Sequence, residues 1–334
     1  MKFAKLTIAL SLAFAATLTL AQDIQERVIK FGHLVQPDHP ISLGTKKFAE
    51  RVEAKSGGKI KVREFGASAL GSDTQQISAL QGGVQEMVAP STTVLASLVK
   101  EMSLIDFPFA LSTPAQVDSL LGGPFGKALY DRLAERGVIG LDYWETGFRN
   151  FTNSRKPITE VEDFKGMKIR VLANPLFVES FSALGANPVP LAFGELYGAL
   201  ESKAVDAQEN PYSVVLSSKL HEVQRYMSVT NHVYTANAIL ISKRFWDKLS
   251  EAEKKILRES ALEAGIYQRK LSRDSAQADR KALEAKGMKI NDVPLTTIAK
   301  MRELTRPVAD KFAASFDPDL VKLYRSELAK GTQR

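Results

Sequence analysis

Residues 163–211 constrain the fold most strongly, because strand-like and helix-like segments alternate along them. A β-like run at 167–171 leads into a helix-like stretch at 176–184, followed by strand-like residues at 185–190, helix-like residues at 192–197 and a closing strand at 204–211. Alternation of this kind is typical of a parallel α/β sheet. Ligands of such sheets bind at the carboxyl ends of the strands. The stretch is therefore the first place to look for a binding site.

Arg170 lies inside the first of these runs, Met-Lys-Ile-Arg-Val at 167–171. A guanidinium among apolar residues requires an anion close by. One candidate is the carboxylate of a ligand, held by two parallel hydrogen bonds. The other is an internal salt bridge to Glu209 or Asp206. The residues alone leave both interpretations open.

The amino terminus has the pattern of a secretory signal peptide. Lys2 and Lys5 precede an almost wholly apolar or hydroxyl-bearing run at 6–20, and the small residues Thr19 and Ala21 predict cleavage after Ala21. The run is shorter than the roughly 20 residues that span a bilayer. We therefore expect an exported protein, and the absence of cysteine is compatible with a bacterial periplasm.

The rest of the chain predicts two α/β lobes. Strand-like runs at 28–34, 59–65 and 138–144 alternate with helix-like runs at 41–55, 73–80 and 114–121, and two more strands are expected at 226–230 and 236–242. Ser250 and Glu253 form a capping-box pattern at the start of a helix that could run to about residue 286. At 1.5 Å per residue such a helix is about 50 Å long, so we expect it to cross between lobes.

Charge and motifs argue against nucleic-acid binding and catalysis. Loss of Lys2 and Lys5 lowers the net charge from +7 to +5, and basic residues are mixed with acidic ones, which is typical of a solvated surface. The four histidines fall in no zinc-protease pattern, and no nucleophile elbow or phosphate-binding loop is present. We expect neither an enzyme nor a bound cofactor.

Three motifs resemble the solute-binding subunit of tripartite ATP-independent periplasmic (TRAP) transporters, the DctP family. They are DFKGMKIRV at 163–171, FGELY at 193–197 and VDAQENP at 205–211. The resemblance covers nearly the whole mature chain. It implies a periplasmic-binding-protein-like α/β fold with a ligand cleft between lobes that exchange strands. We place lobe I at 24–147 plus 236–275 and lobe II at 148–235 plus 276–334.

The resemblance also implies site residues. Arg170 matches the carboxylate anchor of the family, and Arg149 matches a second arginine, for which a surface position is the alternative. Asn210 and Phe193 match ligand contacts, although a turn residue and a core residue would also fit. Lobe I is expected to contribute Asp73, Ser91, Thr92 and His33. Trp144 and Tyr212 could form an aromatic wall or be core residues. Gln208 and Glu209 are weak candidates for binding a cation.

The resemblance implies an extracytoplasmic receptor that is a monomer. We expect it to deliver a small organic anion to the small and large integral-membrane TRAP subunits. A C4-dicarboxylate or a related 2-hydroxy or 2-keto acid is the default ligand for the family, and sugar acids and aromatic acids are alternatives. A periplasmic sensor for a membrane kinase would use the same fold and pocket. An exported hydrolase or lyase ranks behind both.

Overall fold

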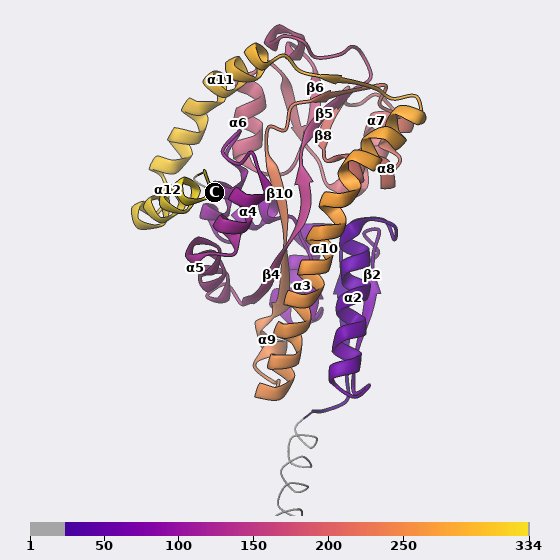
Figure 1. The fold of residues 1–334 in the computed structure, drawn as a ribbon, viewed down its shortest axis with the longest axis vertical. Coiled ribbons are helices and arrows are strands. Elements are labelled where there is room, and N and C mark those ends of the chain that lie inside the picture. Colours follow the sequence, from indigo (N-terminus) through magenta and orange to yellow (C-terminus); the bar gives the residue numbers. More distant parts are fainter. Residues whose placement is uncertain (1–23, 333–334) are drawn as a thin grey trace, which may run out of the picture.

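The computed structural model describes residues 24–332, so the expected signal peptide and its cleavage after Ala21 lie outside the described residues. Two sheets, one above the other in Figure 1, organise these residues. No helix among them is long and apolar enough to cross a membrane.

Lobe I is built on the first sheet, whose strands follow the order β2-β1-β3-β10-β4. The strands are parallel except for β10, which runs antiparallel to β3 and β4. The strands are β1 Arg27–Gly32, β2 Ile60–Phe65, β3 Met87–Val88, β4 Val138–Phe148 and β10 Tyr234–Ser242. The helices, including the short 3-10 helices η1 and η2, are α2 Pro40–Lys55, α3 Asp73–Gly82, η1 Thr92–Ser97, η2 Lys100–Asp106, α4 Pro114–Leu121, α5 Pro124–Ala134 and α9 Lys243–Trp246.

Lobe II is built on the second sheet, with the strand order β11-β9-β5-β8-β6-β7. Its strands are β5 Asn150–Asn153, β6 Lys168–Val171, β7 Asn187–Pro190, β8 Ala207–Asn210, β9 Tyr226–Val229 and β11 Lys289–Asp292. Its helices are η3 Val161–Phe164, α6 Pro175–Ala183, η4 Phe193–Glu195, α7 Leu196–Glu201, α8 Tyr212–Ser217, η5 Leu220–Glu222 and α11 Leu295–Ala314. In the stretch 163–211, β6 is parallel to both β7 and β8, as the alternating pattern predicts.

The chain passes between the sheets at two neighbouring points. Arg149 lies between β4 and β5, and residues 230–233 lie between β9 and β10. The two crossing segments are hydrogen-bonded to each other, because the Arg149 amide donates to the Val233 carbonyl at 2.8 Å and the His232 amide donates to the Arg149 carbonyl at 3.3 Å. These crossings join the two lobes.

The long helix α10, Glu251–Ala285, is a third connection. It begins at the expected capping box, in which the Glu253 amide donates to Ser250 Oγ at 3.2 Å and the Ser250 amide donates to Glu253 Oε2 at 2.8 Å. The helix packs against α2 and β4 of lobe I and reaches α8 of lobe II (Figure 1). The prediction of a helix that crosses between lobes is therefore confirmed.

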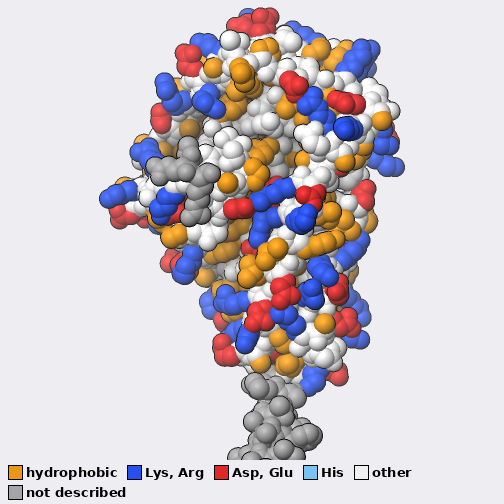
Figure 2. Space-filling view, viewed as in Figure 1, with side chains coloured by type: hydrophobic (Ala, Val, Ile, Leu, Met, Phe, Trp, Pro, Cys, Tyr) orange, Lys and Arg blue, Asp and Glu red, His pale blue; other side chains and the backbone are white. Residues whose placement is uncertain are grey.

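Helix α12, Pro318–Thr332, differs from the sequence-based domain assignment, which placed all of 276–334 in lobe II. Its residues Leu320, Val321 and Tyr324 are buried in the same apolar cluster as Leu120 and Phe125 of α4 and α5. The helix thus completes the core of lobe I, and α11 carries the chain back to it from lobe II. Basic and acidic side chains are interspersed over the face that Figure 2 shows.

Candidate functional site: the cleft between the lobes

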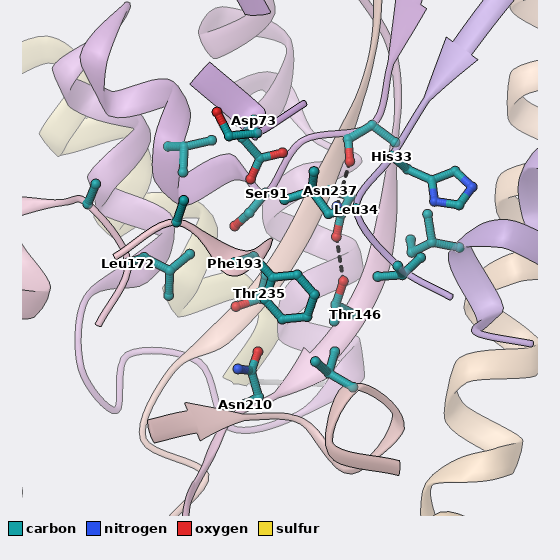
Figure 3. Close-up of a pocket in the computed structure, with 18 of the residues that line it drawn as sticks. His33, Leu34, Asp73, Ser91, Thr146, Leu172, Phe193, Asn210, Thr235 and Asn237 are labelled. Atoms are coloured by element: carbon teal, nitrogen blue, oxygen red, sulfur yellow. Dashed lines mark hydrogen bonds between the residues drawn. The ribbon is translucent and has the colours of Figure 1, made fainter. Parts of the chain in front are cut away.

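A cavity of about 150 Å³ lies between the two lobes. Both sheets contribute to its walls, and the close-up in Figure 3 shows side chains from the two lobes facing one another across it. Residues at the carboxyl end of β6, including Arg170, Leu172 and Ala173, form part of the wall on the lobe II side. This is the edge at which a parallel α/β sheet binds its ligands.

Arg170 lies in this cleft and is 3% exposed. Its Nε and Nη2 donate to the Leu191 carbonyl at 3.0 and 2.8 Å, which fixes the plane of the guanidinium. Burial, followed by repulsion from Arg149, lowers the pKa of Arg170 to about 10. Within residues 24–332 no carboxylate forms an ion pair with Arg170, so neither internal salt bridge considered from the sequence is present.

The two acids considered as partners of Arg170 bind other arginines. Glu209 accepts from Arg149, and Asp206 accepts from the exposed Arg155 at 2.9 Å. Glu209 pairs with Arg149 because Arg149 lies at the crossing from β4 to β5, opposite the end of β8. The charge of Arg170 is thus left to be balanced from the cleft.

Arg149 also lines the cleft, but its charge is already balanced, and it is no surface arginine, being 2% exposed. Its Nε donates to Glu209 Oε2, and its Nη2 donates to Glu209 Oε1 at 2.9 Å. Nη2 also donates to Asn210 Oδ1 at 3.1 Å, and Nη1 donates to Thr235 Oγ1 at 3.0 Å. Arg149 therefore has a structural role at the base of the cleft, where it holds Asn210 and Thr235 in place.

Glu209 is fully buried beneath the cleft, with His232 as its second partner. His232 Nε2 lies 3.1 Å from Glu209 Oε2, and His232 Nδ1 lies 2.8 Å from Thr230 Oγ1. Burial alone would raise the pKa of Glu209, but Arg149 and His232 together hold it below its ordinary value. The carboxylate is thus ionised and internally neutralised.

Neither weak cation candidate faces the cavity. Gln208 donates from Nε2 to Thr152 Oγ1 at 2.7 Å and accepts from Asn210, while Glu209 is engaged by Arg149. Residues 24–332 contain no cluster of three or more His, Cys, Asp or Glu side chains that could hold a metal ion. The sequence-based suggestion of a cation at this pair is not supported by the geometry.

Asn210 and Phe193 both line the cleft from lobe II (Figure 3). The Asn210 side chain bridges Arg149 and Gln208, so its orientation is fixed by the buried network below it. Phe193 is half-buried at the start of η4 and presents an apolar surface to the cavity. Their ligand contacts stay predictions, but their positions allow them.

From lobe I, Asp73, Ser91 and His33 line the cavity. Asp73 is the first residue of α3, and burial raises its pKa to about 7 despite the nearby Arg170. The His33 ring points away from Asp73 in Figure 3, and its Nε2 lies 2.9 Å from Glu64 Oε1.

Thr92 does not line the cavity, because its side chain is fully buried and donates from Oγ1 to the Ala236 carbonyl at 3.2 Å.

Trp144 and Tyr212 do not form the suggested aromatic wall. Trp144 is fully buried in the core of lobe I, where its ring centre lies 6.2 Å from that of Phe31. Tyr212 lies beside a separate hollow next to α10, lined also by Arg273 and Arg280. Both side chains therefore face away from the cleft.

Several cleft residues were missed from the sequence, and Thr146, Thr235 and Asn237 are the polar ones among them that lie on β4 and β10. The pairing of β4 with β10 shifts register here, so that Ala236 faces Glu145 whereas Thr235 faces Gly147, which leaves Thr146 as an extra, bulged residue. Thr146 donates from Oγ1 to Asn237 Oδ1. The signal available in the sequence was the pair of polar residues that interrupts the apolar run at 234–242.

Two α/β lobes, with an arginine in the cavity between them that has no ionic partner among residues 24–332, are the architecture of a two-lobe binding protein for small anions. Residues 31–315 match the family of bacterial extracellular solute-binding proteins, family 7, which is named DctP, and the chain belongs to this family. The family consists of TRAP solute receptors and not of enzymes.

Two relatives and one solved structure match over most of their length. The 2,3-diketo-L-gulonate-binding periplasmic protein YiaO of Escherichia coli is 34% identical over 87% of this chain and 88% of its own length. The C4-dicarboxylate-binding periplasmic protein DctP of Rhodobacter capsulatus is 31% identical over 96% of each chain. The crystal structure of the sugar acid binding protein DctPAm of Advenella mimigardefordensis with galactonate superimposes with a TM-score of 0.91, at 40% identity, over 92% of this chain and 100% of that one.

Proposed function

We propose that this protein is the periplasmic receptor of a TRAP transporter. It binds a small organic acid in the cleft, closes around it, and delivers it to small and large membrane subunits that are driven by an ion gradient. Family membership, the relatives named as periplasmic and the expected signal peptide support this role.

The ligand's carboxylate binds Arg170. The observation that carries this proposal is the buried guanidinium with no ionic partner among residues 24–332, while Arg149 beside it is neutralised by Glu209. Leu191 occupies Nε and one hydrogen of Nη2, so the outer edge of the guanidinium, from Nη1 to Nη2, is available. A carboxylate at that edge receives two charge-assisted hydrogen bonds in a site with little water.

The preferred ligand class is a hydroxylated monocarboxylate of the sugar-acid type. The cavity beyond Arg170 offers hydroxyl, amide and carboxylate groups from Ser91, Thr146, Asn237 and Asp73. These groups suit the hydroxyls of a sugar acid. A second carboxylate on the ligand would instead lie near the acidic Asp73 and near Arg149, whose charge is already balanced by Glu209. The relatives that bind galactonate and 2,3-diketo-L-gulonate point the same way.

A C4-dicarboxylate, the default from the sequence, is the second candidate. The relative from R. capsulatus is named for such ligands, and Arg149 does line the cavity. Arg149 would serve as the second anchor only if Glu209 lost one of the hydrogen bonds that it accepts from Arg149. Burial of Glu209 makes that exchange costly, since a buried carboxylate needs its partner.

Calorimetry on refolded, ligand-free protein tests both proposals, with galactonate and succinate as probes. We expect galactonate to bind at least about tenfold more tightly, a difference of about 1.4 kcal/mol. Tighter binding of succinate would overturn the sugar-acid class, and no binding of either acid would overturn the receptor site. Uptake of labelled galactonate by cells with and without the gene tests the transport role. Unchanged uptake would point instead to a sensor.

A further inference from the structure

Two buried polar contacts join the lobes just outside the cavity lining, one beside α6 and one beside α8, on opposite sides of the central strands in Figure 1. From them we infer that Asn174 and the His39–Ser213 pair are closure clasps. They stabilise the closed form without touching the ligand. This inference rests on the proposed function, because closure around a ligand is what the clasps would favour.

Asn174 forms the first clasp. Its Nδ2 donates to the Thr93 carbonyl at 3.1 Å and to Ser103 Oγ at 3.1 Å, both in lobe I, although Asn174 itself belongs to lobe II. Its Oδ1 accepts from the Leu176 amide at 2.9 Å, which caps α6. All the hydrogens of this amide are used, and the residue is 2% exposed. Such a fully satisfied contact is specific for one arrangement of the lobes.

The residues around this clasp tie it to the cavity. Leu172 and Ala173, which directly precede Asn174, line the cavity from lobe II, and Ser91 and Val94 line it on either side of Thr93. Thr93 is itself held, because its Oγ1 donates to Asp106 Oδ1 at 2.9 Å. Moving the lobes apart at the cavity therefore separates Asn174 from its acceptors.

His39 and Ser213 form the second clasp. His39 Nδ1 accepts from the Ile41 amide at 3.1 Å and so caps α2 of lobe I. The remaining ring nitrogen, Nε2, then carries the hydrogen and donates to Ser213 Oγ of lobe II at 3.1 Å. Burial lowers the pKa of His39 to about 3, so the ring stays neutral. The neighbouring residues Ile41 and Val214 line the cavity from the two lobes.

Two substitutions remove a clasp and leave the helix caps intact. Asn174→Asp keeps an oxygen that can cap α6 but replaces both donors by an acceptor facing the Thr93 carbonyl. Ser213→Ala leaves the His39 Nε2–H buried without an acceptor, and Ser213→Thr restores the hydroxyl. Matched controls in lobe II are Asn187→Asp at an exposed position and Ser217→Ala, whose hydroxyl makes no hydrogen bond within the described residues.

Closure is measured between spin labels at Ser78→Cys on α3 and Glu201→Cys on α7, both exposed. The chain has no cysteine of its own, so only these positions are labelled. We expect Asn174→Asp and Ser213→Ala to shift the distance distribution toward the open form, with and without galactonate. We also expect the Kd for galactonate to rise about fivefold to tenfold. Ser213→Thr and the two controls should match the parent.

Unchanged distances in both variants would overturn the inference, even if the affinity fell, because a purely structural defect does not move the lobe equilibrium. An equal shift in the controls would overturn it as well. If the parent fails to bind galactonate, the proposed ligand class fails, whereas the distances in ligand-free protein still decide whether the clasps exist.

Discussion

Glu209 receives two hydrogen bonds from the Arg149 guanidinium, so only one of the two arginines in the cleft keeps its charge for a ligand. Arg149 lines the cavity and also orients Asn210, whereas Glu209 lies beneath the cavity. The site is thus a single cation, Arg170, placed over an internally neutral network. From this division of roles we expect selectivity for one carboxylate per ligand.

Replacing the anchor by lysine should abolish most binding. A lysine cannot reproduce the planar fork that holds both carboxylate oxygens. We expect Arg170→Lys to cost about 3 kcal/mol of binding free energy, or more than a hundredfold in Kd for galactonate. Calorimetry measures the loss, with Arg155→Lys at an exposed position as control. Near-normal affinity of the lysine variant would rule out two-point anchoring.

Removing the negative charge beneath the cleft should destabilise the fold. Glu209→Gln leaves the buried Arg149 without an ionic partner, and loss of one member of a buried pair costs about 3–5 kcal/mol. Urea unfolding of the ligand-free protein measures the free energy of unfolding. The exposed Glu222, which accepts from Tyr197 Oη at 2.9 Å, provides the control Glu222→Gln. A loss below about 1 kcal/mol would show that Arg149 finds another partner.

Asp73 should make stability depend on pH. Burial raises its folded-state pKa from 3.8 to about 7. Folding therefore takes up a proton between these values, and the free energy of unfolding falls as the pH rises from about 4 to about 7. Asp73→Asn lacks this dependence. Its stability relative to the parent should increase over that range and level off above it, in urea unfolding of ligand-free protein. A difference that does not change with pH, or one equal to that of exposed Asp310→Asn, would contradict the assignment.

Gly265 should not tolerate the alanine that a helix interior normally prefers. Glycine costs about 1 kcal/mol relative to alanine within a helix. A Cβ at Gly265, however, would lie 1.8 Å from Asp142 Oδ2 and 2.9 Å from Trp144 Nε1. We expect Gly265→Ala to lower the free energy of unfolding by about 1–3 kcal/mol. Gly198→Ala on α7 has open space for its Cβ and should stabilise. Stabilisation by both would mean that α10 packs less tightly on β4.

The sequence by itself determined many of the elements and indicated that Arg170 is buried. The alternation over 163–211 predicted parallel strands, and the capping box at Ser250 predicted the start of a long helix. The apolar neighbours of Arg170 indicated that this cation is buried. These features are local, because periodicity and caps depend on residues within a few positions of each other.

Only the tertiary structure decided which acid meets which arginine, which polar residues line the cleft, and where α12 packs. Arg149 and Glu209 are 60 positions apart and meet because β5 and β8 are neighbours in the sheet. Thr146 reaches the cavity through a register shift against β10, and Trp144, two residues earlier, turns into the core. Such pairings depend on long-range packing, which leaves no periodic trace in the chain.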